Sequence, residues 1–197
     1  MKLKDIKDID VCSPESKPST AFCVALGGII SAIVLLMMFC STIFPAFDMA
    51  IPTFAGFLMV VIIIEAGTKW AVTAYFACAA LSILMTPDYE AVLLFILFMG
   101  YYPILFVYIK KLKPFLLRMA VKLLIFNAAI VVYAMFFKFI FTSVDLFEGM
   151  ENFGDMAAPA LLVLANVFFI VYDNLLGMLI AMYSKWFRKK ILKRRKT

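Results

Sequence analysis

Six long apolar segments separated by short polar breaks are the feature that most constrains this sequence. They lie at residues 20–44, 51–66, 69–86, 91–109, 115–142 and 157–184. A helix of about 20 apolar residues crosses the bilayer core, and each segment is near or above that length, although the second and third are short. The chain is 65% hydrophobic, whereas soluble domains are roughly half apolar. The pattern predicts an all-α integral membrane protein with six transmembrane helices.

Basic residues occupy alternate breaks between these segments. Of the 19 Lys and Arg, four lie in residues 1–19 and eight in residues 185–197. The breaks after the first, third and fifth segments hold no Lys or Arg but seven acidic residues. Because cytoplasmic loops carry an excess of Lys and Arg, we expect a multi-pass plasma-membrane protein with both termini cytoplasmic and the acidic loops outside.

The same counts define three regions: a cytoplasmic N-terminal tail at 1–19, a six-helix membrane domain at 20–184 and a basic cytoplasmic tail at 185–197. A basic tail next to a span is typical of a segment that lies on anionic membrane lipid. Basic runs also occur in nucleic-acid patches, but the adjoining span favours lipid. We therefore expect membrane lipid, and no nucleic acid, as a partner of this tail.

The residue types and motifs that catalysis requires are missing from the sequence. It contains no His, which removes the usual proton shuttle and the commonest metal ligand. Its four Cys form no CxxC pair, and it has no HExxH, GxSxG, P-loop or Gly-rich nucleotide turn. An intramembrane aspartyl protease would need two aspartates within the spans, and only Asp173 qualifies. We expect a protein that is not an enzyme and that holds no metal or cofactor.

Small residues line one face of the first segment. They are Ala21, Ala25, Gly28 and Ala32, at spacings of 4, 3 and 4. These spacings place the four residues on one side of a helix, and small faces let helix backbones approach closely in lipid. Two interpretations stay open: the face packs against this chain's own helices, or it docks another membrane subunit.

Polar side chains inside the apolar segments concentrate toward the C-terminus. They are Lys122, Asn127, Lys138, Asn166, Asp173 and Asn174. If the fifth and sixth segments form an antiparallel pair about a loop centred near residue 149, Lys122 lies ~6 Å along the axis from the level of Asp173. A lone charge inside the bilayer costs several kcal/mol, so a partner is expected. We predict a Lys122–Asp173 ion pair, with Asn127 and Asn174 as its hydrogen-bond partners, and favour a structural role for it.

The architecture and one motif resemble a known family. Six spans, cytoplasmic termini and the sequence AFCVA at residues 21–25 resemble the substrate-binding S component of energy-coupling factor (ECF) vitamin transporters. In that family an AxxxA motif in the first span packs against the energising membrane subunit. The resemblance covers nearly the whole chain in architecture and carries no signature for a particular vitamin.

The resemblance implies uptake of a small, vitamin-like nutrient, driven by a separate membrane subunit and its ATPases. It implies an outward-facing pocket, capped by FPAFDMAIP, TPDYE and TSVDLFEGMENFGDM and lined by the last three helices. The lining candidates are Tyr101, Tyr102, Tyr133, Lys138, Asn166 and Asp173. Aromatic walls with a few polar groups suit a flat ring, and acidic loops favour a cationic or amine-bearing ligand.

Two other functions remain open. A non-transporting accessory or assembly subunit of a larger complex would use the same small-residue face but need no ligand cavity. A self-contained channel or exporter would need a polar path through both leaflets, and the cytoplasmic half of the first three segments shows none.

Overall fold

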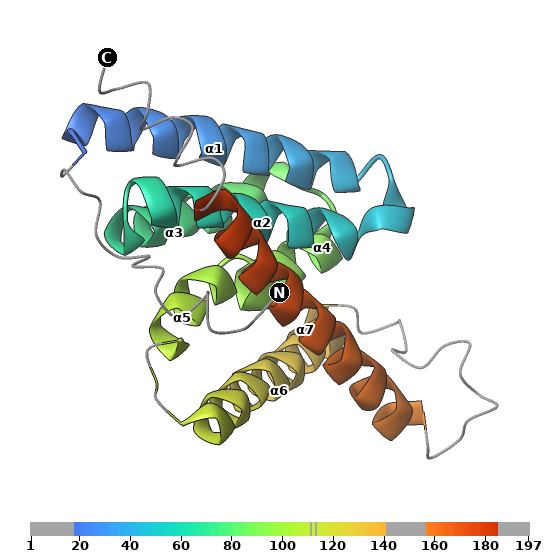
Figure 1. Cartoon of the computed structure of the whole chain (residues 1–197). Helices are drawn as coiled ribbons and strands as arrows, with labels where there is room; N and C mark the ends of the chain where they lie inside the picture. Colours follow the sequence, from blue (N-terminus) through green and yellow to red (C-terminus); the bar gives the residue numbers. More distant parts are fainter. Residues whose placement is uncertain (1–17, 111, 113, 141–156, 185–197) are drawn as a thin grey trace. The chain divides into compact units, whose positions relative to one another are not determined.

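The computed structural model describes residues 18–110, 112, 114–140 and 157–184, which contain helices and no strand (Figure 1). The α-helices are α1 (Thr20–Ser41), α2 (Ala50–Glu65), α3 (Thr68–Met85), α4 (Tyr89–Leu94), α5 (Tyr102–Ile109), α6 (Phe115–Ile140) and α7 (Ala157–Met182). A 3-10 turn, η2 (Pro45–Phe47), precedes α2, and a π-helical segment, η3 (Phe95–Met99), follows α4. The all-α prediction is confirmed. Residues 1–17 of the predicted N-terminal tail, the whole predicted basic tail and the whole loop TSVDLFEGMENFGDM lie outside the described residues.

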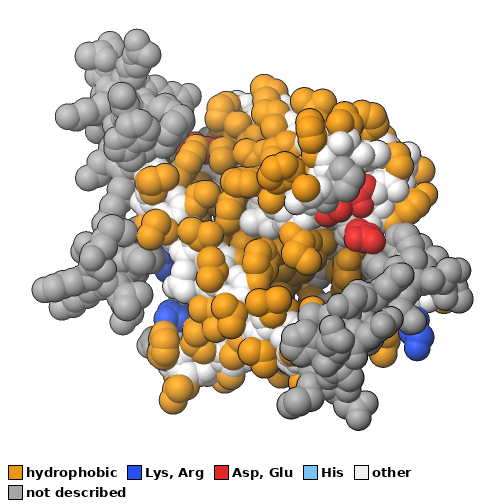
Figure 2. Space-filling view, turned by 90° about the vertical axis from the view of Figure 1, so that its right-hand side faces the viewer, with side chains coloured by type: hydrophobic (Ala, Val, Ile, Leu, Met, Phe, Trp, Pro, Cys, Tyr) orange, Lys and Arg blue, Asp and Glu red, His pale blue; other side chains and the backbone are white. Residues whose placement is uncertain are grey.

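Five helical stretches are long and apolar enough to cross a membrane. They are Thr20–Ser41, Thr68–Met85, Tyr89–Ile109, Phe115–Phe136 and Pro159–Met182. Helix α2 is equally apolar but has 16 residues, which gives it a length of about 24 Å against a hydrocarbon core of about 30 Å. Apolar side chains cover much of the visible surface (Figure 2). These features are compatible with a multi-pass membrane protein, while six full spans stay a prediction.

Capping residues and a turn glycine mark where several helices begin and end. The Ser19 side chain accepts a hydrogen bond from the backbone N–H of Phe22 and caps α1. Gly67, between α2 and α3, has a φ of 94°, a conformation that glycine adopts without the steric cost of a side chain. Asp88 caps α4 by accepting from the N–H of Ala91 at 3.2 Å. Capping and turn residues therefore set these boundaries.

The described residues divide into two compact units. The first unit contains the residues up to Tyr108 and those from Leu175 onward, and the second contains Ile109–Asn174. Helix α7 thus contributes its N-terminal part to the second unit and its C-terminal end to the first.

Helices α1, α2 and α3 form the core of the first unit and lie along one another (Figure 1). Their buried residues include Ile30, Val34 and Met38 of α1, Met59, Ile62 and Ile63 of α2, and Ala71, Ala74 and Cys78 of α3. The buried side chains of α3 are small, so they let its backbone pack close to α1.

The π-helical segment η3 interrupts the stretch Tyr89–Ile109 within the first unit. The N–H of Gly100 donates to the carbonyl of Phe95, five residues back, at 2.8 Å. The Tyr75 hydroxyl of α3 donates to the carbonyl of Ile96 at 2.7 Å. A Cβ on Gly100 would lie 2.8 Å from the Tyr75 ring and 2.9 Å from the Phe95 carbonyl oxygen. This close approach explains why a glycine stands at position 100.

The second unit joins α6 to the first part of α7. The rings of Phe126 and Phe169 stack with their centroids 4.5 Å apart and their planes 13° from parallel. Contacts pair low-numbered residues of α6 with high-numbered residues of α7, so the two helices run antiparallel. The predicted antiparallel hairpin is confirmed.

Candidate functional site

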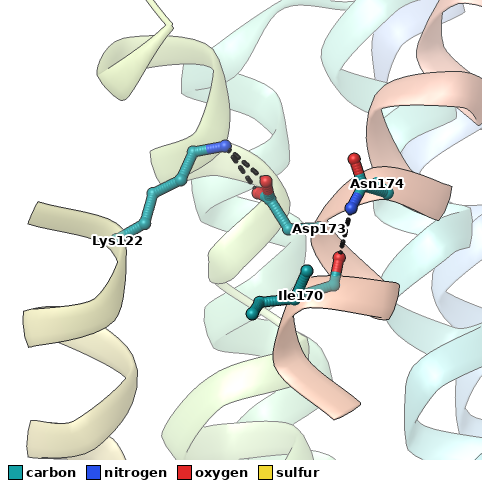
Figure 3. A network of polar contacts seen from close by, with 4 residues as sticks. All are labelled: Lys122, Ile170, Asp173 and Asn174. Carbon is teal, nitrogen blue, oxygen red and sulfur yellow. Dashed lines mark hydrogen bonds and ion pairs between the residues drawn. The ribbon is translucent and has the colours of Figure 1, made fainter. Parts of the chain in front are cut away.

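A charged pair links the two helices of the second unit. The Lys122 ammonium donates to both carboxylate oxygens of Asp173, at 2.6 and 2.7 Å (Figure 3). The two side chains are 7% and 14% exposed, so little water screens the pair. The predicted ion pair is confirmed. The ammonium contacts both carboxylate oxygens, and such charge-assisted hydrogen bonds are shorter and stronger than neutral ones.

The amides expected beside this ion pair lie elsewhere. Asn174 donates to the carbonyl of Ile170 on its own helix at 2.8 Å (Figure 3). Asn127 exchanges hydrogen bonds with Asn166 instead. The expectation that Asn127 and Asn174 hold the ion pair is therefore wrong, because Asn174 bonds to its own helix and Asn127 bonds to Leu123 and Asn166.

Asn127 and Asn166 form a second polar link between α6 and α7. Asn127 donates to the Asn166 side-chain oxygen at 3.1 Å, and Asn166 donates to the Asn127 side-chain oxygen at 3.3 Å. Each amide also donates to a carbonyl of its own helix at 2.8 Å, that of Leu123 or Leu162. Both donors of each side-chain amide are thus used within the hairpin.

Sequence reasoning missed the Asn127–Asn166 link because it misplaced the hairpin midpoint. The observed pairings place that midpoint near residue 147, about two residues before the assumed position. Polar groups buried in lipid need hydrogen-bond partners within the protein. Aligning the hairpin so that Asn127 meets Asn166 would therefore have predicted the correct register. Lys122 and Asn127 point about 140° apart on α6, and both still reach α7 because the helix interface lies between them, at Phe126.

Two of the candidate lining residues belong to the aromatic core of the first unit. Tyr102 is 0% exposed, and its ring lies 4.7 Å from that of Phe98. Tyr101 is half-buried, with edge contacts to Tyr75 and Phe98 at 6.1 and 6.4 Å. Tyr102 therefore packs as a core residue and offers no surface to a ligand in this structure.

The other four candidates lie in the second unit. Asp173 and Asn166 are engaged in the two polar links, Tyr133 is half-buried and Lys138 is exposed near the end of α6. The structure therefore brings Asn166 and Asp173 to one face of α7, seven residues apart, but it does not gather the six candidates within one unit.

The small-residue face of α1, formed by Ala21, Ala25, Gly28 and Ala32, is exposed along its whole length. A Cβ added at Gly28 would meet no atom within 4 Å. The opposite side of α1 carries the buried residues. Among the described residues nothing packs on the small-residue face, so the interpretation that it serves internal packing is not supported.

Acidic side chains gather at the loops before α2 and α4, within a mostly apolar surface (Figure 2). The carboxyl of Asp48 lies beside that of Asp88. Burial first, and then the neighbouring Asp88 carboxylate, raise the pKa of Asp48 above its ordinary value. In the described part of the chain no three His, Cys, Asp or Glu side chains form a group that could hold a metal ion.

The geometry therefore offers two features of functional interest: a pair of polar links within a helix hairpin, and an uncovered small-residue face on α1. Neither feature contains a nucleophile held by a base, as nucleophilic catalysis would need. Comparison with protein-family models, with curated proteins and with solved structures finds no match to this chain.

Proposed function

We propose that this protein is the substrate-binding membrane subunit of an uptake system for a small, vitamin-like nutrient. It would span the plasma membrane six times, with both termini cytoplasmic, and would work with a separate energising membrane subunit and its ATPases. The observation that carries the proposal is the exposed small-residue face of α1, formed by Ala21, Ala25, Gly28 and Ala32.

The exposed side of α1 also carries large apolar residues such as Ile29 and Leu36, so what distinguishes this face is the small size of its side chains. Large side chains such as Ile30, Val34 and Met38 are buried against α2 and α3. A face of Ala and Gly gains little from contact with lipid tails, which are as apolar as the helix itself, but it lets another helix backbone approach closely. A partner helix in the membrane is the occupant that such a face suits.

The ligand side of the proposal rests on the acidic loops. Asp48 and Asp88 lie on loops that the distribution of basic residues predicts to be external. Two adjacent carboxyl groups favour a cation, so the proposed nutrient is cationic or carries an amine. Tyr133 and Lys138 remain candidate contacts, whereas the burial of Tyr102 removes it from the proposed lining.

A second function is favoured by a separate observation. The four polar side chains of the α6–α7 hairpin satisfy one another: Lys122 with Asp173, and Asn127 with Asn166. Groups engaged in this way are less available to a ligand. A non-transporting accessory or assembly subunit would use the α1 face in the same manner and would need no ligand groups.

The test is native mass spectrometry of the protein purified gently from its host cells. A co-purifying small molecule together with ATPase subunits is the expected result. The variant Gly28→Leu should lose the ATPase subunits and keep the small molecule, because it blocks the docking face alone. Ile33→Leu, at an exposed position outside that face, is the matched control and should keep both.

Two outcomes would contradict the proposal. ATPase subunits that stay with Gly28→Leu would show that the α1 face is not the docking surface. A partner without any small molecule, under conditions that preserve bound ligands, would favour the accessory subunit.

A further inference from the structure

The link between α5 and α6 contains a cation that nothing in the described chain neutralises. Lys110 follows directly on Ile109, the last residue of a candidate span. Its Nζ has almost no exposed surface and no hydrogen-bond partner among the described residues. A buried ammonium without an anion is strongly disfavoured. Its position at the end of a span therefore calls for an anionic partner.

Positive charge accumulates around this lysine. Burial first, and then the charges of Arg118 and Lys122, lower the pKa of Lys110 below its ordinary value. Arg118 lies in the first turn of α6, with its guanidinium 5.4 Å from the centre of the Phe115 ring. The start of a helix adds a partial positive charge of its own.

The chain supplies little negative charge in return. No Asp or Glu occurs in the sequence between Glu90 and Asp145. Lys122, one turn beyond Arg118 on the same side of α6, already has its carboxylate in Asp173. Within the described residues, Lys110 and Arg118 form no salt bridge. The two cations therefore present an anion-binding position at the end of the helix hairpin.

The chemistry of the two side chains points to phosphate. A guanidinium donates two parallel hydrogen bonds to phosphate oxygens, and an ammonium adds a point charge. Basic positions next to membrane spans bind the head groups of anionic lipids. The Phe115 ring beside the Arg118 guanidinium is 61% exposed, so acyl chains have an apolar surface beside the cations. A lipid phosphate matches both features, whereas a free phosphate ion matches one.

We propose that Lys110 and Arg118 hold the phosphate of an anionic membrane lipid at the boundary between the fourth and fifth spans. This site does not depend on the transport proposal, because it lies on α6 and the link before it and uses none of the residues of the α1 face. The ligand class is a phosphodiester head group such as that of phosphatidylglycerol.

The test is a titration of the full-length protein in detergent, with bound lipid counted by native mass spectrometry. Phosphatidylglycerol should bind about tenfold more tightly than zwitterionic phosphatidylcholine, as expected for one charge-assisted contact. Lys110→Gln should abolish this preference. Lys69→Gln removes the same charge from an exposed position in the first turn of α3, and it should leave the preference intact.

Competition with inorganic phosphate distinguishes a lipid phosphate from a soluble one, and additional variants keep the test decisive if one variant misfolds. Inorganic phosphate at the same concentration should fail to displace the lipid, and displacement would overturn the lipid assignment in favour of a soluble anion. Equal losses in Lys110→Gln and Lys69→Gln would overturn the site itself. If Lys110→Gln does not fold, Arg118→Gln should lose the preference and Lys110→Arg should retain it, and the opposite result would overturn the proposal.

Discussion

The two units hold their helices together with different kinds of side chain. In the first unit, small and large apolar residues interlock, as where the ring of Tyr75 lies against Gly100. In the second unit, α6 and α7 are joined by an ion pair and by a pair of amides. Counted over the most apolar part of each stretch, 61% of the residues are buried in Tyr89–Ile109, 28% in Thr68–Met85 and 22% in Thr20–Ser41, against 17% in Phe115–Phe136.

This difference is compatible with helices that have the bilayer as their solvent. Lipid tails are as apolar as leucine, so burying apolar side chains between helices gains little, and helices associate through close packing or polar contacts. The first unit has many close contacts and needs few polar ones. The hairpin of the second unit has a sparsely buried surface, so its polar links contribute a larger share of its stability. Four predictions test this contrast.

The largest effect is expected at the ion pair. Lys122→Met leaves the Asp173 carboxylate without its lysine, and we expect a loss of about 3 kcal/mol in the free energy of unfolding. Lys122→Met combined with Asp173→Asn should lose much less than the two single losses together, because neither charge remains. Unfolding in mixed detergent–SDS micelles, followed by circular dichroism, measures each loss. Additive losses would show that the two side chains are not coupled.

The second-largest loss of stability is expected where helices of the first unit pack closely around Gly100. Gly100→Ala would place a methyl group 2.8 Å from the Tyr75 ring, and we expect a loss of about 2 kcal/mol from the resulting overpacking. Gly27→Ala is the matched control, since a Cβ there meets nothing within 4 Å and alanine favours a helix. The same unfolding assay compares the variants. Equal behaviour of the two would contradict the packing role of Gly100.

The amide pair should contribute less than the ion pair. Asn127→Leu removes its link to Asn166, and we expect a loss of about 1 kcal/mol, since interhelical hydrogen bonds in membranes are individually modest. Asn174→Leu, which breaks a bond only to its own helix, should cost less. A larger loss in Asn174→Leu would reverse the assignment. The measurement is again the free energy of unfolding in micelles.

The smallest effect is expected where the first unit places like charges together. The pKa of Asp48 is raised in the folded protein by burial and by Asp88. The folded state therefore holds this proton more tightly than the unfolded state, and its stability falls as the pH rises through the interval between the two pKa values. Asp48→Asn should raise the melting temperature slightly at pH 7, and this gain should vanish below about pH 4. A gain that persists in acid would exclude this cause.

Helix positions were predictable because their signals are local. The predicted end at residue 109 and the predicted start at residue 115 coincide with the end of α5 and the start of α6. Gly67 and Asp88 mark breaks because a left-handed turn and a helix cap depend on one or two residues. The ion pair was also predictable, since a lone charge in an apolar segment requires a partner.

Side-chain partners were less predictable because they depend on register. An error of about two residues in the hairpin midpoint gave Asn127 the wrong partner. Tyr101 and Tyr102 are adjacent in sequence, but the π-helical segment before them and the surrounding packing leave one half-buried and the other fully buried. No local pattern separates two neighbouring tyrosines in this way.

The sequence by itself determined that this is a helical protein of membrane character and that Ala21, Ala25, Gly28 and Ala32 share one face of a helix, because apolar length and helical period are properties of consecutive residues. Tertiary structure decided which side of α1 is buried, which amides meet and why position 100 must be glycine. These outcomes depend on which side chains of other helices pack against a given residue. The spacing of residues along one helix does not specify the residues of the helix that packs against it.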